Sequence, residues 1–138
     1  KNIELNYSNL VDPSTRIIAD PEQLKKVIDN IVGNSTKYMD KPKGVINIRI
    51  LDEVDSVRVE IEDNGKGIST KDLGKIFERL YRTDASRNSS TGGSGIGLSI
   101  VKKIIEDHGG YIWATSKDGE GTCLHFVIRK YREAEENE

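Results

Sequence analysis

The sequence predicts an α+β domain in which helices cover one face of a mostly antiparallel sheet. Short apolar segments follow one another along the chain and are separated by turn residues, as the strands of hairpins are. Two longer segments instead repeat their apolar residues at helical spacing. The 138 residues have the size of one domain and are enough to bury a core. Adjacent strand pairs with interspersed helices are typical of this class.

The N-terminal part predicts two short strands and then a long helix. Residues 3–7 and 16–19 have strand character, with Pro13 in the turn between them. Residues 20–22 (Asp-Pro-Glu) predict a helix start, because they supply an acidic N-cap, a proline at the first helical position and an acid in the first turn. The helix should end near Tyr38. Its apolar residues recur at helical spacing: Leu24, Val27, Ile28, Ile31 and Val32.

The next segments predict a hairpin. Residues 41–44 form a turn, and residues 45–51 and 56–62 are strands joined by a short connection. In the second strand Val57, Val59 and Ile61 share one face. Because side chains alternate along a strand, Asp63 should lie on that same apolar face.

The following segments predict two helices with a long polar stretch between them. Residues 70–77 suggest a short helix, and residues 96–106 an amphipathic one that ends before Gly109-Gly110. Residues 82–95 contain Ala85 as their one apolar side chain. A structureless stretch of that length within a domain is usually a functional lid or is disordered.

The chain closes with a hairpin of residues 111–116 and 122–128, turned around Asp118-Gly119. Residues 132–138 have too little apolar content to pack and predict an acidic, disordered tail. The acidic end and the abrupt start suggest a piece of a longer protein.

Composition excludes several classes of function. The 21 Lys and Arg residues nearly balance the 23 Asp and Glu residues, so the net charge of −2 gives no sign of nucleic-acid or membrane binding. No apolar run approaches the length of a membrane span. The single cysteine, Cys123, excludes an internal disulfide and fits a reducing cytosol. It lies in an apolar run, which favours a small packed side chain over a reactive thiol.

Polar residues form a stripe on the first predicted helix. Asn30, Asn34 and Lys37 fall within a sector of roughly 60° beside the apolar sector. An ordinary solvated face is the plain alternative. Asparagine is a poor residue for a helix interior, so two of them in mid-helix favour a functional stripe.

The segment Asp63-Asn64-Gly65-Lys66-Gly67-Ile68 has two interpretations of about equal weight. A carboxylate on an apolar strand face needs a partner, and the amino group of adenine could donate to it. Equally, an Asp-Asn-Gly sequence is common in exposed turns.

Four glycines, at 92, 93, 95 and 97, precede the second long helix. Glycines allow a ligand to approach the backbone, and the first N–H groups of a helix can face a phosphate. This favours phosphate binding over a merely flexible helix start.

Other nucleotide-binding motifs are absent. No lysine-serine or lysine-threonine pair follows a glycine at P-loop spacing, and Ile100 stands where a Rossmann motif needs glycine. The signatures of protein serine/tyrosine kinases are absent as well.

In this order and spacing the blocks closely resemble the catalytic ATP-binding domain of bacterial two-component sensor histidine kinases. Residues 30–38 look like the N box, 63–68 like the G1 box, 77–82 like the F box and 93–98 like the G2 box. The superfamily also includes gyrase B, MutL and a heat-shock chaperone. The resemblance implies its two-layer α/β sandwich (Bergerat fold), with about three helices on one face, over residues 1–131.

The resemblance also implies MgATP as the bound nucleotide and assigns roles to residues at its phosphate end. Asn34 would bind Mg²⁺, and Asn30 would support the metal and phosphate side. Lys37 and Arg82 would contact phosphates and, with Asn30, form the catalytic set.

At the base end, the resemblance places Tyr38 near the adenine and makes Asp63 the acceptor for the adenine amino group. The remaining nucleotide-contacting residues that it implies are Gly65, Gly67, Ile68, Tyr81, Gly93, Gly95, Ile96, Gly97 and Leu98.

Asn30 discriminates between branches of this superfamily. In the hydrolytic members that this sequence resembles, and in the anti-sigma serine kinases, a glutamate stands four residues before the metal-binding asparagine and acts as general base. An amide cannot take a proton at neutral pH, so Asn30 argues for transfer to an imidazole. A hydrolytic ATPase module and a non-catalytic nucleotide-sensing domain remain as alternatives.

The acceptor histidine should lie outside this chain. His108 ends a helix and His125 lies in a strand, so both are expected to be structural. The resemblance implies two partners, a dimerisation and histidine-phosphotransfer domain of the same parent and a response-regulator receiver domain. It implies a cytoplasmic, monomeric domain of a membrane-bound bacterial sensor, without nucleic-acid contact or direct membrane contact.

Overall fold

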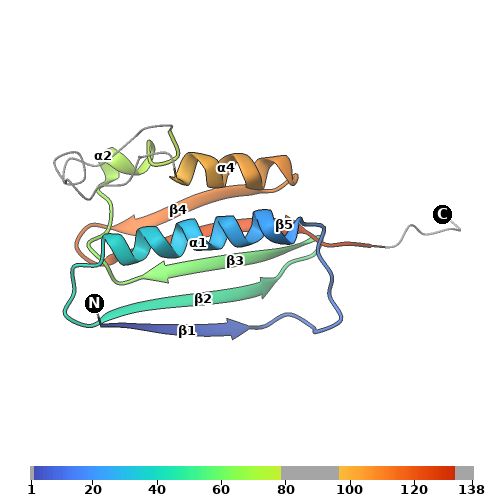
Figure 1. The fold of residues 1–138 in the computed structure, drawn as a ribbon, viewed down its shortest axis with the longest axis horizontal. Helices are drawn as coiled ribbons and strands as arrows, with labels where there is room; N and C mark the ends of the chain where they lie inside the picture. Colours follow the sequence, from blue (N-terminus) through green and yellow to red (C-terminus); the bar gives the residue numbers. More distant parts are fainter. Residues whose placement is uncertain (1, 79–96, 133–138) are drawn as a thin grey trace, which may run out of the picture.

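The computed structural model describes residues 2–78 and 97–132, which form a five-stranded sheet and three helices (Figure 1). Their order is β1 (Ile3–Asn9), α1 (Pro21–Lys37), β2 (Gly44–Asp52), β3 (Ser56–Asp63), α2 (Thr70–Leu73), α4 (Gly97–Asp107), β4 (Tyr111–Lys117) and β5 (Gly121–Arg129). Within the described residues, no helix combines the length and the apolar character needed to cross a membrane.

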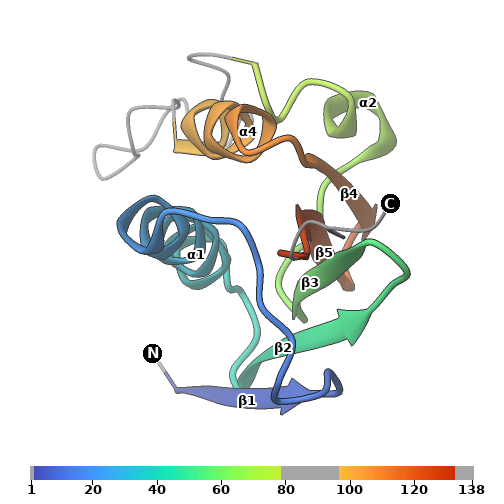
Figure 2. The ribbon, with the colours of Figure 1, turned by 90° about the vertical axis from the view of Figure 1, so that its right-hand side faces the viewer.

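The sheet has the strand order β1-β2-β3-β5-β4. Strands β1 and β2 are parallel, with α1 in the connection between them, and the other three neighbouring pairs are antiparallel. Helices α1 and α4 lie side by side over one face of the sheet, and the opposite face carries no helix of the described residues (Figure 2). This confirms the predicted α+β class with a mostly antiparallel sheet.

Helix α1 begins where its capping residues predict. The Asp20 carboxylate accepts hydrogen bonds from the backbone N–H groups of Glu22 at 2.9 Å and Gln23 at 3.4 Å, which satisfies two of the donors that a helix start leaves unpaired. At the other end the Tyr38 N–H donates to the carbonyl of Asn34 at 3.0 Å. The helix therefore has a fixed start and end.

The core lies between the helices and the sheet. Its side chains come from α1, α4 and the inner faces of β2, β3, β4 and β5, together with Met39, because strand alternation directs every second strand residue towards the helices. The largest of the fully buried ones are Phe126, Ile31, Ile46, Ile61, Ile105, Ile128, Val27 and Val101. Burial of this apolar surface holds α1 and α4 against the sheet.

Two predicted elements differ in the structure. Residues 16–19 are not a strand, because Ile17 makes only an isolated bridge with Lys130 while the chain passes from the sheet to the helix layer. The predicted helix over 70–77 ends at Leu73. After it, hydrogen bonds join residues three apart, as in Lys75 N to Asp72 O at 2.9 Å, so the chain continues in tight turns. Ile96 and residues 133–138 lie outside the described residues.

Replacing Ile31 with alanine should destabilise the domain by about 2–5 kcal/mol, because it leaves a cavity between α1 and the sheet. Ile31 is 1% exposed, whereas Val54 is 81% exposed and serves as the matched control. Urea unfolding should give near wild-type stability for Val54→Ala. Equal stability of the two variants would contradict the assignment of Ile31 to the core.

Candidate functional site

Three segments that are distant in the sequence meet at one end of the domain. The last turn of α1, the end of β3 and the start of α4 all lie on the same side of the molecule (Figure 1). The two helices approach closely here, since a methyl group added to Gly97 would lie 3.2 Å from Oδ1 of Asn30. The polar stripe of α1 is therefore adjacent to the helix that follows the glycine-rich segment.

The stripe consists of partly buried side chains. Asn30, Asn34 and Lys37 are all intermediate in exposure. Asn30 donates from Nδ2 to the carbonyl of Lys26 at 2.7 Å, so its amide is anchored on its own helix while Oδ1 lies near α4. Asn34 and Lys37 continue the same face towards the end of α1, at helical spacing. The arrangement offers amide oxygens and an ammonium group next to a helix start.

Asp63 lies on the inward face of β3, as the sequence predicted, and also stabilises the turn that follows. As the last residue of β3 it continues the inward-facing series that includes Ile61, and it is half-buried. Its Oδ1 accepts from the N–H groups of Gly65 at 2.9 Å and Thr122 at 3.3 Å. The first bond is a side-chain turn of the kind aspartate favours, and the second ties β3 to β5. Oδ2 makes neither of these bonds.

The turn after Asp63 is packed tightly against the hairpin of β4 and β5. Gly67 has φ +76, and a Cβ there would lie 2.3 Å from the carbonyl oxygen of Lys117, so only glycine fits. The Ile68 N–H donates to Oγ of Ser116 at 2.7 Å, and the Gly119 N–H donates to the carbonyl of Lys66 at 2.6 Å. The turn is thus fixed from two sides.

Lys41 is a residue of this region that the sequence analysis did not single out. Its Nζ donates to the carbonyls of Gly65 at 2.9 Å and Gly119 at 3.0 Å, and pairs with Asp40 at 3.1 Å. One ammonium therefore joins the turn after β3 to the turn between β4 and β5. A lysine in a predicted turn carries no sequence signal for this role.

Tyr38 lies beside positive charge. The Nζ atoms of Lys37 and Lys66 are 5.3 and 5.4 Å from the centre of its ring, within the range of cation–π attraction. Its carbonyl accepts from the Lys66 N–H at 3.4 Å, which places it against the turn after β3. The end of α1 thus places an aromatic ring and two ammonium groups beside the turn after β3.

The described residues cover part of the predicted site. Leu98 packs against the hydrophobic core from the start of α4. Tyr81, Arg82, Gly93, Gly95 and Ile96, together with the predicted lid, lie outside the described residues.

His108 has the structural role that the sequence predicted. Its Nδ1 is 2.8 Å from the carbonyl of Ile104, and its Nε2 accepts from the Asp20 N–H at 3.1 Å. It therefore joins the end of α4 to the start of α1. His125 lies on the other face of the sheet, where it contacts Glu60.

The sequence of residues 19–132 matches the family described as histidine kinase-, DNA gyrase B- and HSP90-like ATPases. The chain belongs to this family. Its relatives include the sensor histidine kinase WalK of Bacillus subtilis (strain 168), 37% identical over 133 residues, and the sensor protein kinase WalK of Staphylococcus aureus, 38% identical over 110 residues. These matches cover 94% and 79% of this chain but 21% and 26% of the relatives, so the chain corresponds to one domain of larger proteins.

Solved structures give the same classification. The mycobacterial sensor histidine kinase MprB has a TM-score of 0.81 at 27% identity, covering 95% of this chain and 86% of its own. The catalytic domain of histidine kinase ThkA has a TM-score of 0.77 at 33% identity, covering 93% of this chain and 79% of its own. Full-length ShkA, solved in complex with AMPPNP, has a TM-score of 0.79 at 25% identity, covering 95% of this chain and 27% of its own.

Gly67→Ala should weaken ATP binding and lower the melting temperature, because the added methyl group clashes with the Lys117 carbonyl in a backbone conformation that alanine avoids. Gly74→Ala is the matched control, since Gly74 has helical dihedral angles and open space around it. Calorimetric titration and thermal melting should separate the two variants. Equal behaviour would show that the turn after β3 does not need its observed conformation.

Proposed function

We propose that this domain binds MgATP and transfers the γ-phosphoryl group to a histidine on a separate helical domain of its parent protein. A receiver-domain aspartate of a response regulator would then accept the phosphoryl group. The observation that carries the proposal is the position of Asn30, whose Oδ1 would lie 3.2 Å from a methyl group added to Gly97 at the start of α4. An amide occupies the position where a hydrolytic site needs a carboxylate, directly beside the helix start that would face the phosphates.

Asp63 supports recognition of the base. Its Oδ1 is held by two backbone N–H groups, while Oδ2 makes neither bond. In the proposed complex the adenine amino group donates to this carboxylate. Tyr38 and the turn at Gly65 and Gly67 border the same region, since Gly65 packs against the Tyr38 carbonyl and Lys66 lies over the Tyr38 ring.

The phosphate end of the proposed site has the right donor chemistry for Mg²⁺. Amide oxygens such as those of Asn34 and Asn30 are hard ligands that suit this ion. Lys37 adds a positive charge on the same side, and the start of α4 directs partial positive charge towards an anion. Arg82, Gly93 and Gly95 complete the proposed phosphate contacts from the segment outside the described residues.

The transfer step needs little proton chemistry from this domain. A neutral imidazole is already nucleophilic, so its nitrogen can form the new bond to phosphorus as the bond to the ADP oxygen breaks. Catalysis then consists of positioning and charge neutralisation, as in other phosphoryl transfers. Asn30 cannot activate water by removing its proton, so hydrolysis should be slow.

Asn34→Ala should weaken MgATP binding by about tenfold or more and leave adenosine binding nearly unchanged, because the variant loses a metal ligand and keeps the base pocket. Isothermal titration with each ligand measures the difference. Asn6→Ala is the control, since Asn6 is an exposed asparagine that bonds Asn47 in β2, away from α1. Equal losses for MgATP and adenosine would contradict the role of Asn34.

The isolated domain should bind γ-labelled ATP without labelling itself, and the parent's histidine-bearing helical domain should become labelled when it is added. Covalent linkage of the two should increase the yield by raising the effective concentration. Acid-labile label on the isolated chain that disappears in His108→Gln or His125→Gln would overturn the proposal. Rapid release of phosphate by the isolated chain would favour the hydrolytic alternative.

A further inference from the structure

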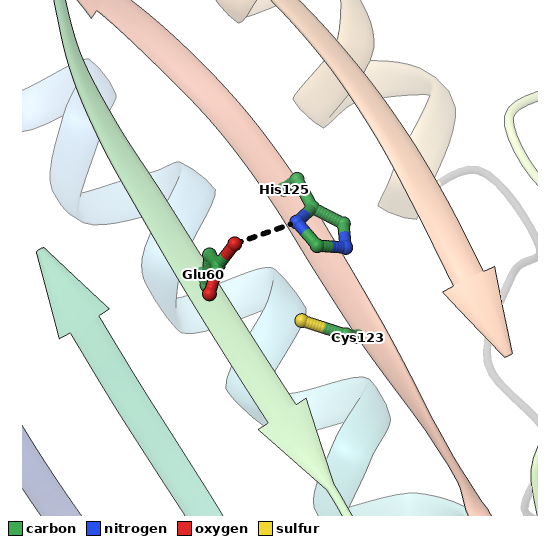
Figure 3. Close-up of side chains that lie close together, drawn as sticks. All are labelled: Glu60, Cys123 and His125. Atoms are coloured by element: carbon green, nitrogen blue, oxygen red, sulfur yellow. Dashed lines mark hydrogen bonds and ion pairs between the residues drawn. The ribbon is translucent and has the colours of Figure 1, made fainter. Parts of the chain in front are cut away.

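The sheet face opposite the helices carries a cluster of metal-ligating side chains, Glu60, Cys123 and His125 (Figure 3). Glu60 of β3 pairs directly with His125 of β5, and Cys123 precedes His125 by two residues on the same strand face. One potential ligand atom from each residue lies within 4.8 Å of the other two. Strand pairing therefore brings a carboxylate, a thiol and an imidazole together, on the face of the sheet opposite that of Asp63.

We propose that these three residues bind a borderline-soft divalent metal ion of the Zn²⁺ type. Sulfur, imidazole nitrogen and a carboxylate oxygen are the donors that zinc takes in proteins, whereas Mg²⁺ and Ca²⁺ prefer oxygen alone. Three protein ligands leave a fourth position for water or another donor. The candidate nucleotide site uses residues of the other face of the sheet and does not include these three side chains.

The donors are shielded from solvent to a degree that suits a built site. The side chains of His125 and Glu60 are 13% and 12% exposed, and Cys123 is buried. Burial, followed by the charge of Glu60, raises the pKa of Cys123 to about 12, so without a metal ion the sulfur is an inert thiol. A bound cation would favour the thiolate over the thiol, because coordination to a metal ion deprotonates a thiol.

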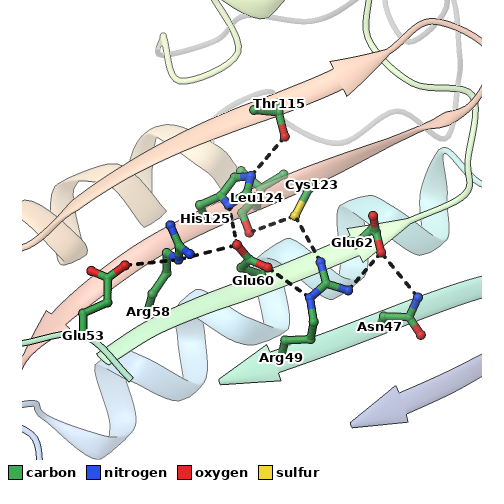
Figure 4. A network of polar contacts seen from close by, with 10 residues as sticks. All are labelled: Asn47, Arg49, Glu53, Arg58, Glu60, Glu62, Thr115, Cys123, Leu124 and His125. Atoms are coloured by element: carbon green, nitrogen blue, oxygen red, sulfur yellow. Dashed lines mark hydrogen bonds and ion pairs between the residues drawn. The ribbon is translucent and has the colours of Figure 1, made fainter. Parts of the chain in front are cut away.

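Neighbouring groups orient the imidazole as ligand histidines are usually oriented. His125 Nε2 lies 3.0 Å from the hydroxyl of Thr115, while Nδ1 lies 3.1 Å from Glu60 Oε2 (Figure 4). The ring of Trp113 stacks on the imidazole with centres 5.0 Å apart and 3° between the planes. With Nε2–H donated to Thr115, the metal ion would replace the proton between Nδ1 and the carboxylate.

Two arginines border the cluster, and acidic partners balance them. Arg49 bonds both Glu60 and Glu62 at 3.0 Å, and Arg58 lies 3.4 Å from Glu53 and 3.5 Å from Glu60. Burial pushes the pKa of Glu60 upward, but hydrogen bonds from Arg49 and His125 outweigh it, so the pKa is lower than usual. Arg49 Nη2 also lies 4.0 Å from Cys123 Sγ, and the carboxylates of Glu53, Glu60 and Glu62 outnumber the two guanidinium groups (Figure 4).

The test is titration of the metal-free domain with Zn²⁺ alone, and with Co²⁺ as a spectroscopic probe. One equivalent of Zn²⁺ should bind and raise the melting temperature, and Co²⁺ should give a sulfur-to-metal charge-transfer band. Cys123→Ser should abolish the band. Glu60→Gln and His125→Gln should each lower the affinity for Zn²⁺ by more than about tenfold, since the loss of a group that only orients a ligand already lowers metal affinity by that much. Thr115→Val should lower the affinity for Zn²⁺ by about tenfold, because it removes the hydroxyl that orients His125.

Glu106→Gln and His108→Gln are matched controls, because each changes the same residue type outside the cluster and outside its arginine network. Both should keep the charge-transfer band and wild-type Zn²⁺ affinity, and ATP affinity should stay unchanged in Cys123→Ser. Absence of the band in the folded wild-type domain, or binding that survives Cys123→Ser, would overturn the proposal. The wild-type melting shift and spectrum decide the matter even where a variant fails to fold.

Discussion

The structure of the candidate site depends on one carboxylate oxygen. Oδ1 of Asp63 accepts the N–H groups of Gly65 and Thr122, so a single atom joins the end of β3, the following turn and the start of β5. Charge-assisted hydrogen bonds of this kind are stronger than neutral ones. The turn is then held against the β4–β5 hairpin by Lys41 and by the tight fit of Gly67. The turn after β3 is therefore held in place by contacts within the domain itself.

Strands β3 and β5 give the domain two chemically different faces. Towards the helices they present buried apolar residues such as Ile61 and Phe126, ending in the carboxylate of Asp63. Towards the other side they present the charged cluster around Glu60 and His125 (Figure 4). Strand alternation therefore places the proposed metal ligands and Asp63 on opposite faces of the same two strands.

The sequence predicted the features that rest on local rules. The cap at Asp20, the alternation that placed Asp63 on the apolar face, and the hairpins were confirmed, because each depends on neighbouring residues. The bridge at Ile17 was mistaken for a strand, since its partner Lys130 is distant in the sequence. The contacts of Lys41 and the register between β3 and β5 could not be predicted, because they arise only when distant segments pack together.

Asp63→Asn tests the central claim most directly, because it keeps an acceptor oxygen and the shape of the side chain but removes the charge. ATP affinity measured by isothermal titration should fall by about tenfold or more while circular dichroism shows the fold intact, since hydrogen bonds to a charged group contribute about 1.5–3 kcal/mol. Asp118→Asn, in the exposed β4–β5 turn, should bind ATP as the wild type does. Wild-type affinity in Asp63→Asn would contradict the account and leave Asp63 as a turn residue only.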